Sequence, residues 1–187
     1  MGYYKVLFSW YEKSNIHIED IEYDSLYANK LNQGISLKGM KNPKATLENL
    51  TGKYTDFLYT PESEHIVSEK VKAFLEETEG KENFEFFSVD FNISGQPSYY
   101  LMNIIGIIDA FDWEKSDYVL FDELGPKGNK VIHNMNRMEI DENKTEGKRI
   151  FLMKDYIGTT YLHQSLADEM NAAGITGFKA QPLVGNT

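Results

Sequence analysis

The sequence predicts an α+β fold with mixed, mainly antiparallel sheets and two pseudo-repeated strand–helix–strand units. Short apolar runs bounded by glycine and proline alternate with two stretches of helical periodicity. Aromatic residues make up 13% of the chain and are mostly Tyr and Phe, which favour strands. The order strand, helix, strand occurs in residues 57–91 and again in residues 150–183. We therefore expect two related units packed in one body.

The N-terminal part is predicted to be rich in strands. Apolar side chains there recur at near-alternating positions, and glycines with a proline break the pattern between them. The predicted strands are residues 3–10, 16–23 and 54–59, and residues 29–53 are predicted as loop with short strands.

A helix is predicted directly after residue 67. Ser68 is a suitable N-cap, since its hydroxyl can accept a hydrogen bond from the first free backbone N–H groups. Val71, Phe74 and Leu75 follow at helical spacing and predict one buried apolar stripe. Gly80 is expected to end the helix.

A second helix and several strands are predicted in the rest of the chain. Leu166 and Met170 mark the helix, which is expected to begin near His163 and to end at Gly174. The strands are predicted from short β-branched and aromatic runs, with a turn at residues 125–129. They are residues 84–91, 119–121, 131–132, 149–153 and 177–180.

The composition indicates the cellular compartment of the protein and excludes sites that need cysteine. The chain has 187 residues and no cysteine, which excludes disulfides, thiolate metal sites and cysteine nucleophiles. It shows no signal-peptide pattern and no apolar run near the ~20 residues of a membrane helix. We therefore expect a cytoplasmic protein without a membrane partner.

The net charge of −10 lies in two segments. Residues 62–85 hold eight acidic residues and three lysines, and residues 109–123 hold six acidic residues and one lysine. Because nucleic-acid binding needs a basic face, the sequence argues against it. Two interpretations are open: solvated faces that promote solubility, or an acidic surface that docks a basic protein.

No catalytic constellation is visible, and we expect no enzymatic activity, cofactor or metal. The four histidines are scattered, and structural or surface roles are expected for them. Asp109 and Asp112 could offer carboxylates to a divalent cation. The alternative, which we favour, is that Asp112 caps the backbone around residues 113–115.

The second acidic segment also contains Trp113, Tyr118 and Phe121. Aromatic side chains among acidic ones suit a protein-binding hot spot, but they equally suit a core. We favour core packing for these aromatics. If the segment is a docking face, we expect its partner contacts at Asp117, Tyr118 and Glu123.

The stretch from Tyr99 to Ser116 carries a family resemblance. Its Tyr-Tyr-Leu-x-Asn start and its Asp-Ala-x-Asp-x-Glu-Lys-Ser continuation resemble immunity protein family 11, formerly domain of unknown function 1629. Three further stretches resemble the family's central helix start, a late strand and a closing helix-to-strand turn: residues 66–71, 149–152 and 173–178.

This resemblance implies an immunity protein that binds a cognate secreted bacterial toxin, often one delivered by a type VI or contact-dependent system. It implies a single domain over residues 1–187, with a divergent β-rich part at 1–55 and a family-like region at 56–183. It supplies no catalytic residues, and the oligomeric state stays undetermined. The alternatives are a secretion adaptor or chaperone for a toxin, or a small-ligand-binding domain or enzyme.

Overall fold

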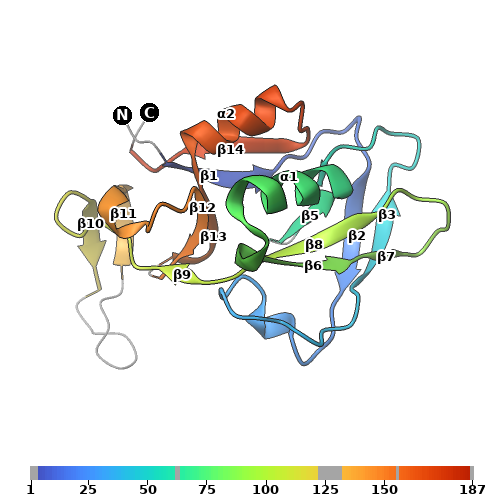
Figure 1. Ribbon diagram of the computed structural model, residues 1–187, viewed down its shortest axis with the longest axis horizontal. Coiled ribbons are helices and arrows are strands. Elements are labelled where there is room, and N and C mark those ends of the chain that lie inside the picture. Colours follow the sequence, from blue (N-terminus) through green and yellow to red (C-terminus); the bar gives the residue numbers. More distant parts are fainter. Residues whose placement is uncertain (1–3, 62–63, 122–131, 155, 186–187) are drawn as a thin grey trace.

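The computed structural model describes residues 4–61, 64–121, 132–154 and 156–185. Within these ranges two α-helices are combined with four sheets (Figure 1). Neighbouring strands are antiparallel except for the pairs β9–β12 and β3–β7, which are parallel. The predicted α+β class with mixed, mainly antiparallel sheets is therefore confirmed.

Two sheets lie on the side of the molecule that carries α1 (Glu69–Glu79). The four-stranded sheet has the order β4 (Phe57–Leu58), β5 (His65–Ser68), β8 (Tyr99–Ile104) and β6 (Phe84–Ser88). The three-stranded sheet has the order β2 (His17–Glu22), β3 (Lys44–Glu48) and β7 (Asp90–Phe91). Short 3₁₀ turns lie at Ala28–Lys30 and Lys81–Asn83.

The five-stranded sheet carries α2 (Gln164–Ala172). Its order is β14 (Phe178–Pro182), β1 (Tyr4–Ser9), β13 (Tyr156–His163), β12 (Ile150–Met153) and β9 (Ile107–Ile108). A separate pair, β10 (Asp117–Leu120) and β11 (Ile132–Arg137), stands at one end of the molecule (Figure 1). A 3₁₀ turn lies at Glu142–Lys144.

The central strands are buried on both faces, so their alternating side chains enter different cores. Along β12, Ile150 and Leu152 enter the core between the two helix-bearing sheets. Phe151 and Met153 point to the opposite side and pack with residues near β10 and β11. On the four-stranded sheet, Leu101 likewise enters a third core shared with β2 and β3.

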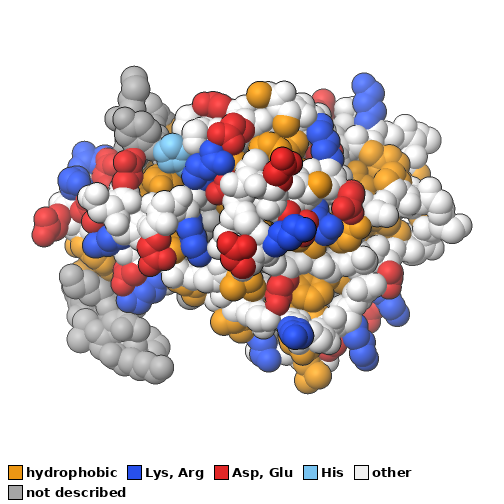
Figure 2. Space-filling model, viewed as in Figure 1, with side chains coloured by type: hydrophobic (Ala, Val, Ile, Leu, Met, Phe, Trp, Pro, Cys, Tyr) orange, Lys and Arg blue, Asp and Glu red, His pale blue; other side chains and the backbone are white. Residues whose placement is uncertain are grey.

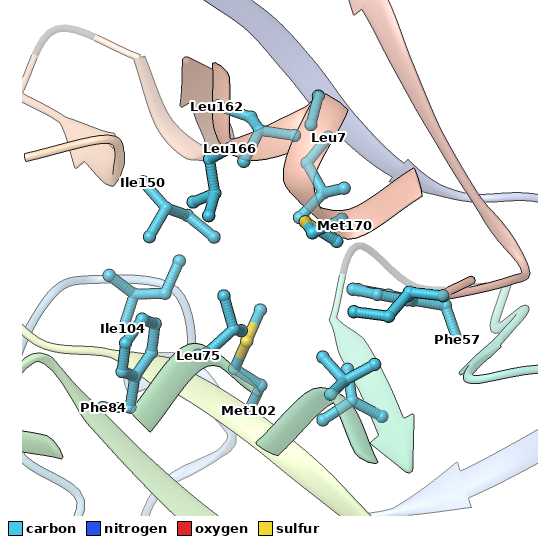
Figure 3. Packing of buried hydrophobic residues seen from close by; sticks show 14 of the residues in the cluster. Leu7, Phe57, Leu75, Phe84, Met102, Ile104, Ile150, Leu162, Leu166 and Met170 are labelled. Atoms are coloured by element: carbon cyan, nitrogen blue, oxygen red, sulfur yellow. The ribbon is translucent and has the colours of Figure 1, made fainter. Parts of the chain in front are cut away.

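The largest core joins both helices and both helix-bearing sheets (Figure 3). Val71 and Leu75 of α1 are fully buried there, and so are Leu166 and Met170 of α2, as predicted. Phe74 is only partly buried, contrary to the prediction. It lies three residues after Val71 at the edge of the stripe, where it packs against the rim of this core.

Each helix follows a strand directly, and the last residue of that strand is the N-cap of the helix. The hydroxyl of Ser68 accepts a hydrogen bond from the backbone N–H of Val71 at 3.4 Å, which confirms the predicted cap. His163 caps α2 in the same way, since its Nδ1 accepts from the backbone N–H of Ser165 at 3.2 Å. Gly80 ends α1 with a φ of 89°.

The predicted units at 57–91 and 150–183 are built from a hairpin, a helix and a returning strand. In the first unit β8 lies between β5 and β6, and in the second β1 lies between β13 and β14. The inserted strand is antiparallel to both of its neighbours in each case. That the two units are repeats of one another stays a prediction.

Two strands were not predicted, and two predicted strands differ from the structure. A strand was not expected directly before either helix, yet β5 and β13 occupy those places. The predicted strand at 54–59 is paired only over Phe57–Leu58. The predicted strand 84–91 changes sheets at Val89, because Asp90 donates its backbone N–H to the carbonyl of Pro43 and continues as β7.

Candidate functional site

The predicted docking residues lie on the β10–β11 pair. Asp117 is exposed and stands opposite Arg137 in the register of the two strands. Tyr118 is half-buried, and its hydroxyl donates to the backbone carbonyl of Trp113 at 3.2 Å. Glu123 and the predicted turn at 125–129 lie outside the described residues. The structure thus places Asp117 in solvent and gives Tyr118 packing contacts within its own chain.

The three aromatic residues of this segment have different environments. Trp113 and Tyr118 pack edge-to-face at 5.3 Å and join the core around Phe111, as the core interpretation predicts. Phe121 is 51% exposed and contacts the ring of His133, so core packing is wrong for this residue. The outward side of β10 therefore presents Asp117, Val119 and Phe121 to solvent.

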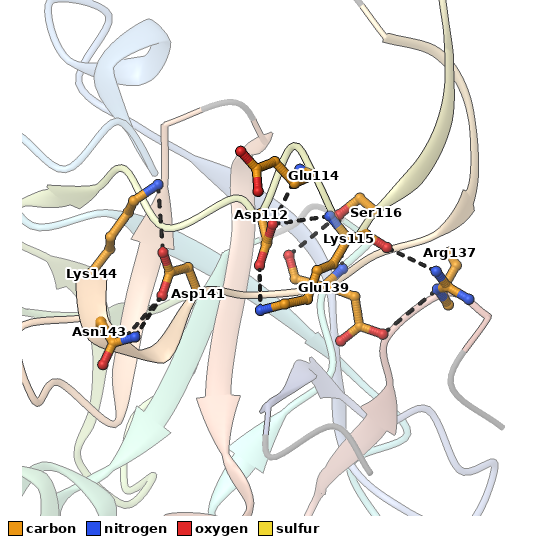
Figure 4. Close-up of polar contacts among 9 residues, drawn as sticks. All are labelled: Asp112, Glu114, Lys115, Ser116, Arg137, Glu139, Asp141, Asn143 and Lys144. Carbon is orange, nitrogen blue, oxygen red and sulfur yellow. Dashed lines mark hydrogen bonds and ion pairs between the residues drawn. The ribbon is translucent and has the colours of Figure 1, made fainter.

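Asp112 shapes the turn that leads into β10 (Figure 4). Its Oδ1 accepts hydrogen bonds from the backbone N–H groups of Glu114 at 3.1 Å and Lys115 at 3.0 Å, which confirms the capping interpretation. Its Oδ2 lies 3.0 Å from Nζ of Lys115. Burial raises the pKa of Asp112, but these contacts outweigh burial and hold its pKa below the ordinary value.

Asp109 does not join Asp112 in a shared site. Its carboxylate pairs with Nζ of Lys154 at 2.8 Å instead. Among the residues that the structure describes, no group of three acidic or histidine side chains is placed to hold a metal ion.

Removing the Asp112 carboxylate is expected to destabilise this turn. Asp112→Ala leaves two backbone N–H groups without their acceptor, so the free energy of unfolding should fall by about 1–2 kcal/mol. Chemical denaturation measures this change. Asp117→Ala, on an exposed side chain in the same segment, is the control and should shift stability by no more than about 0.5 kcal/mol. Equal effects of the two substitutions would show that the Asp112 contacts contribute nothing.

One basic side chain from another segment pairs with an acidic residue of 109–123, since Lys154 contacts Asp109, and other bases lie nearby. Arg137 donates to the backbone carbonyl of Lys115 and approaches Glu139 at 3.7 Å, and Lys144 pairs with Asp141 (Figure 4). Together with Lys154, these bases come from residues 137–154. The pair Lys144–Asp141 is local, but the pairing of Lys154 with Asp109 could not be predicted, because no local pattern tells which distant base will fold beside an acid.

The first acidic segment is also compensated within the fold. Glu79 is buried against Arg149, and Glu85 binds the backbone N–H of Leu37 and the side chain of Asn103. Glu69 pairs with Lys72 on the same helix. Figure 2 shows acidic and basic side chains interspersed over the face that α1 covers. The charge concentrated in residues 62–85 therefore does not form an uninterrupted acidic surface.

The comparisons with known proteins identify the family. A model of the Immunity protein family (Imm11) matches residues 21–184. The chain belongs to this family. Membership in Imm11 links it to toxin immunity in general, and such families are generally non-enzymatic. No curated protein matches the chain. Among the described residues, no helix is long and apolar enough to cross a membrane.

Two of the stretches that carry the Imm11 resemblance meet in space. The carboxylate of Asp56 accepts a hydrogen bond from the hydroxyl of Ser68 and two from Thr176. Nζ of Lys70 donates to the backbone carbonyl of Gly174 at 2.7 Å. These contacts join the start of α1 to the turn between α2 and β14.

A third such stretch begins with Arg149, which links the two helices. Its guanidinium pairs with Glu79 at the end of α1 and with Glu169 of α2, each at 2.6 Å. These resembling stretches thus hold the two units together. Because these stretches make contacts within the chain, we look for partner-binding residues on other surfaces.

Proposed function

We propose that this Imm11 protein protects the cell that makes it by binding one cognate secreted toxin in a stoichiometric complex. The family match over residues 21–184 carries this proposal. We place the complex in the cytoplasm and the toxin among those delivered between neighbouring bacteria by type VI or contact-dependent secretion. Binding alone is sufficient for protection, so no cofactor or turnover is needed.

We propose the outward side of β10 as a contact surface. Asp117 supplies charge there, while Val119 and Phe121 are 47% and 51% exposed. Apolar side chains beside a carboxylate suit a protein interface, in which apolar groups supply affinity and charge steers association. Tyr118 supports the strand from behind, and Glu123 extends the proposed acidic contact.

A titration against the purified cognate toxin tests the stoichiometry. Toxin activity should fall linearly with added protein and reach its minimum near one equivalent. The measurement is residual toxin activity against the molar ratio, at concentrations far above the dissociation constant. If a small fraction of an equivalent silences the toxin, the protein acts by turnover and the proposal fails.

Charge reversal tests the place of contact. In Glu114→Lys/Asp117→Lys the association rate with the toxin should drop roughly tenfold at low salt, and the difference should shrink at high salt. The matched control is Glu19→Lys/Asp20→Lys, which makes the same charge change on exposed residues of β2. If both variants associate at equal rates, docking does not use β10.

A further inference from the structure

A pocket opens where β1 leaves β13. Tyr4, Lys5 and Val6 pair with β13, whereas residues 5–9 pair with β14 on the other side. Beyond Val6 the two strands diverge around a cavity of about 320 Å³. The lining residues come from β1, from the described ends of the β4–β5 connection, from the start of β5 and from β13.

An irregularity in β13 forms the wall opposite β1. Leu152 of β12 pairs with Thr160, but the next residue, Met153, pairs with Tyr156, so the ladder skips residues 157–159. Gly158 has a φ of 93°, a backbone conformation that residues with a Cβ rarely adopt. Such bulges redirect side chains and are frequent beside functional sites. The skipped residues of β13 thus produce the opening between the strands.

The inner end of the pocket is polar. His65 is buried, with Nδ1 at 3.3 Å from the hydroxyl of Ser9 and Nε2 at 3.1 Å from the hydroxyl of Thr160. Burial lowers the pKa of His65 to about 4, so the imidazole is neutral near pH 7. Glu64 is the one Asp, Glu, Lys or Arg residue among the described lining residues.

Two aromatic side chains line the pocket, and further aromatic residues lie next to them in the chain or in space. Phe8, which is 42% exposed, and Tyr59 are the lining residues. The ring of Tyr11, 46% exposed, packs edge-to-face against Tyr59 at 5.1 Å. Trp10, further along the same segment, is 39% exposed and already holds an ammonium group, that of Lys179, over its ring.

We propose that this pocket receives a lysine or arginine side chain of a protein partner. The lining residues Phe8 and Tyr59 offer apolar and aromatic surface to the stem of such a side chain. The Ser9 and Thr160 hydroxyl groups beside His65 and the lining carboxylate of Glu64 accept hydrogen bonds from an ammonium or guanidinium group. A phosphate or carboxylate ligand would instead be repelled by Glu64.

The cavity lies at the small end of the range for ligand pockets, which fits one side chain better than a cofactor. The net charge of −10 favours a basic partner. We take this partner to be the toxin, an assignment that rests on the proposed function. The pocket is then a second contact besides β10, and it anchors one basic residue of the toxin.

The test uses small probes and needs no toxin, so its failure is distinct from failure of the proposed function. N-acetyl-arginine amide is titrated into the intact protein while the ring resonances of His65 are followed by nuclear magnetic resonance. N-acetyl-citrulline amide, which has nearly the same shape without the charge, is the control ligand. The arginine probe should shift the His65 resonances saturably and bind at least roughly tenfold more tightly than the citrulline probe.

Two variants locate the binding. Glu64→Gln should weaken the arginine probe roughly tenfold and abolish the preference over citrulline. Because Glu64 is partly buried, Phe8→Lys is a second variant at an exposed position, and its ammonium group should weaken the probe by a similar factor. Leu26→Lys makes the same kind of change at an exposed residue that does not line the pocket and should leave binding unchanged. Equal binding of both probes, no shift at His65, or equal effects of Phe8→Lys and Leu26→Lys would overturn the proposal.

Discussion

Leu75→Ala is expected to lower the free energy of unfolding by about 2–5 kcal/mol. Leu75 is fully buried in the core that joins both helices and both helix-bearing sheets (Figure 3). Truncation removes apolar contacts and leaves a cavity that two rigid sheets cannot readily close. Chemical denaturation followed by circular dichroism measures the change.

Glu77→Ala is the matched control for this experiment, since Glu77 is an exposed residue of the same helix. It removes a side chain at a helical position without opening the core, and stability should stay within about 0.5 kcal/mol. A denaturation midpoint for Leu75→Ala close to that of Glu77→Ala would show that α1 does not pack as described.

His65 is expected to make the protein sensitive to acid. Its pKa is lowered by burial from the ordinary 6.5 to about 4. Between these values the unfolded chain binds a proton that the folded chain does not, so stability falls as the pH drops through this window. Between pH 7 and pH 4 this group alone should cost roughly 3 kcal/mol of stability.

The comparison with His65→Gln isolates this contribution. A glutamine can contact the hydroxyls of Ser9 and Thr160 but does not titrate, while the carboxylates, including Glu64, titrate in both proteins. The unfolding free energies of the two proteins, measured from pH 7 to pH 4, should therefore diverge at acid pH. Parallel pH curves would show that His65 is protonated without cost in the folded state.

Local signals in the sequence were sufficient to predict the two helices. Ser68, the stripe of Val71 and Leu75, and Gly80 each act within a few residues, so spacing alone predicts their roles. The strand before each helix was missed for a physical reason. The residues of β5 run directly into α1, and β13 contains Gly158, so neither has the boundaries that separate a strand from its neighbours.

The surfaces were harder to predict because they depend on distant partners. The acidity of residues 109–123 is visible in the sequence, but the pairing of Asp109 with Lys154 is not. The pocket beside His65 likewise needs three segments brought together by the sheets. No spacing rule connects Ser9, His65 and Thr160, since a fold-specific strand order makes them neighbours.

The position of β1 has a consequence for the order of events during synthesis. This strand is synthesised long before either of its neighbours, β13 and β14. Tyr4–Ser9 therefore cannot form both of its strand pairings until residues 178–182 have left the ribosome. Any activity that needs the five-stranded sheet therefore begins only after residues 178–182 have emerged, and not while β1 alone is available.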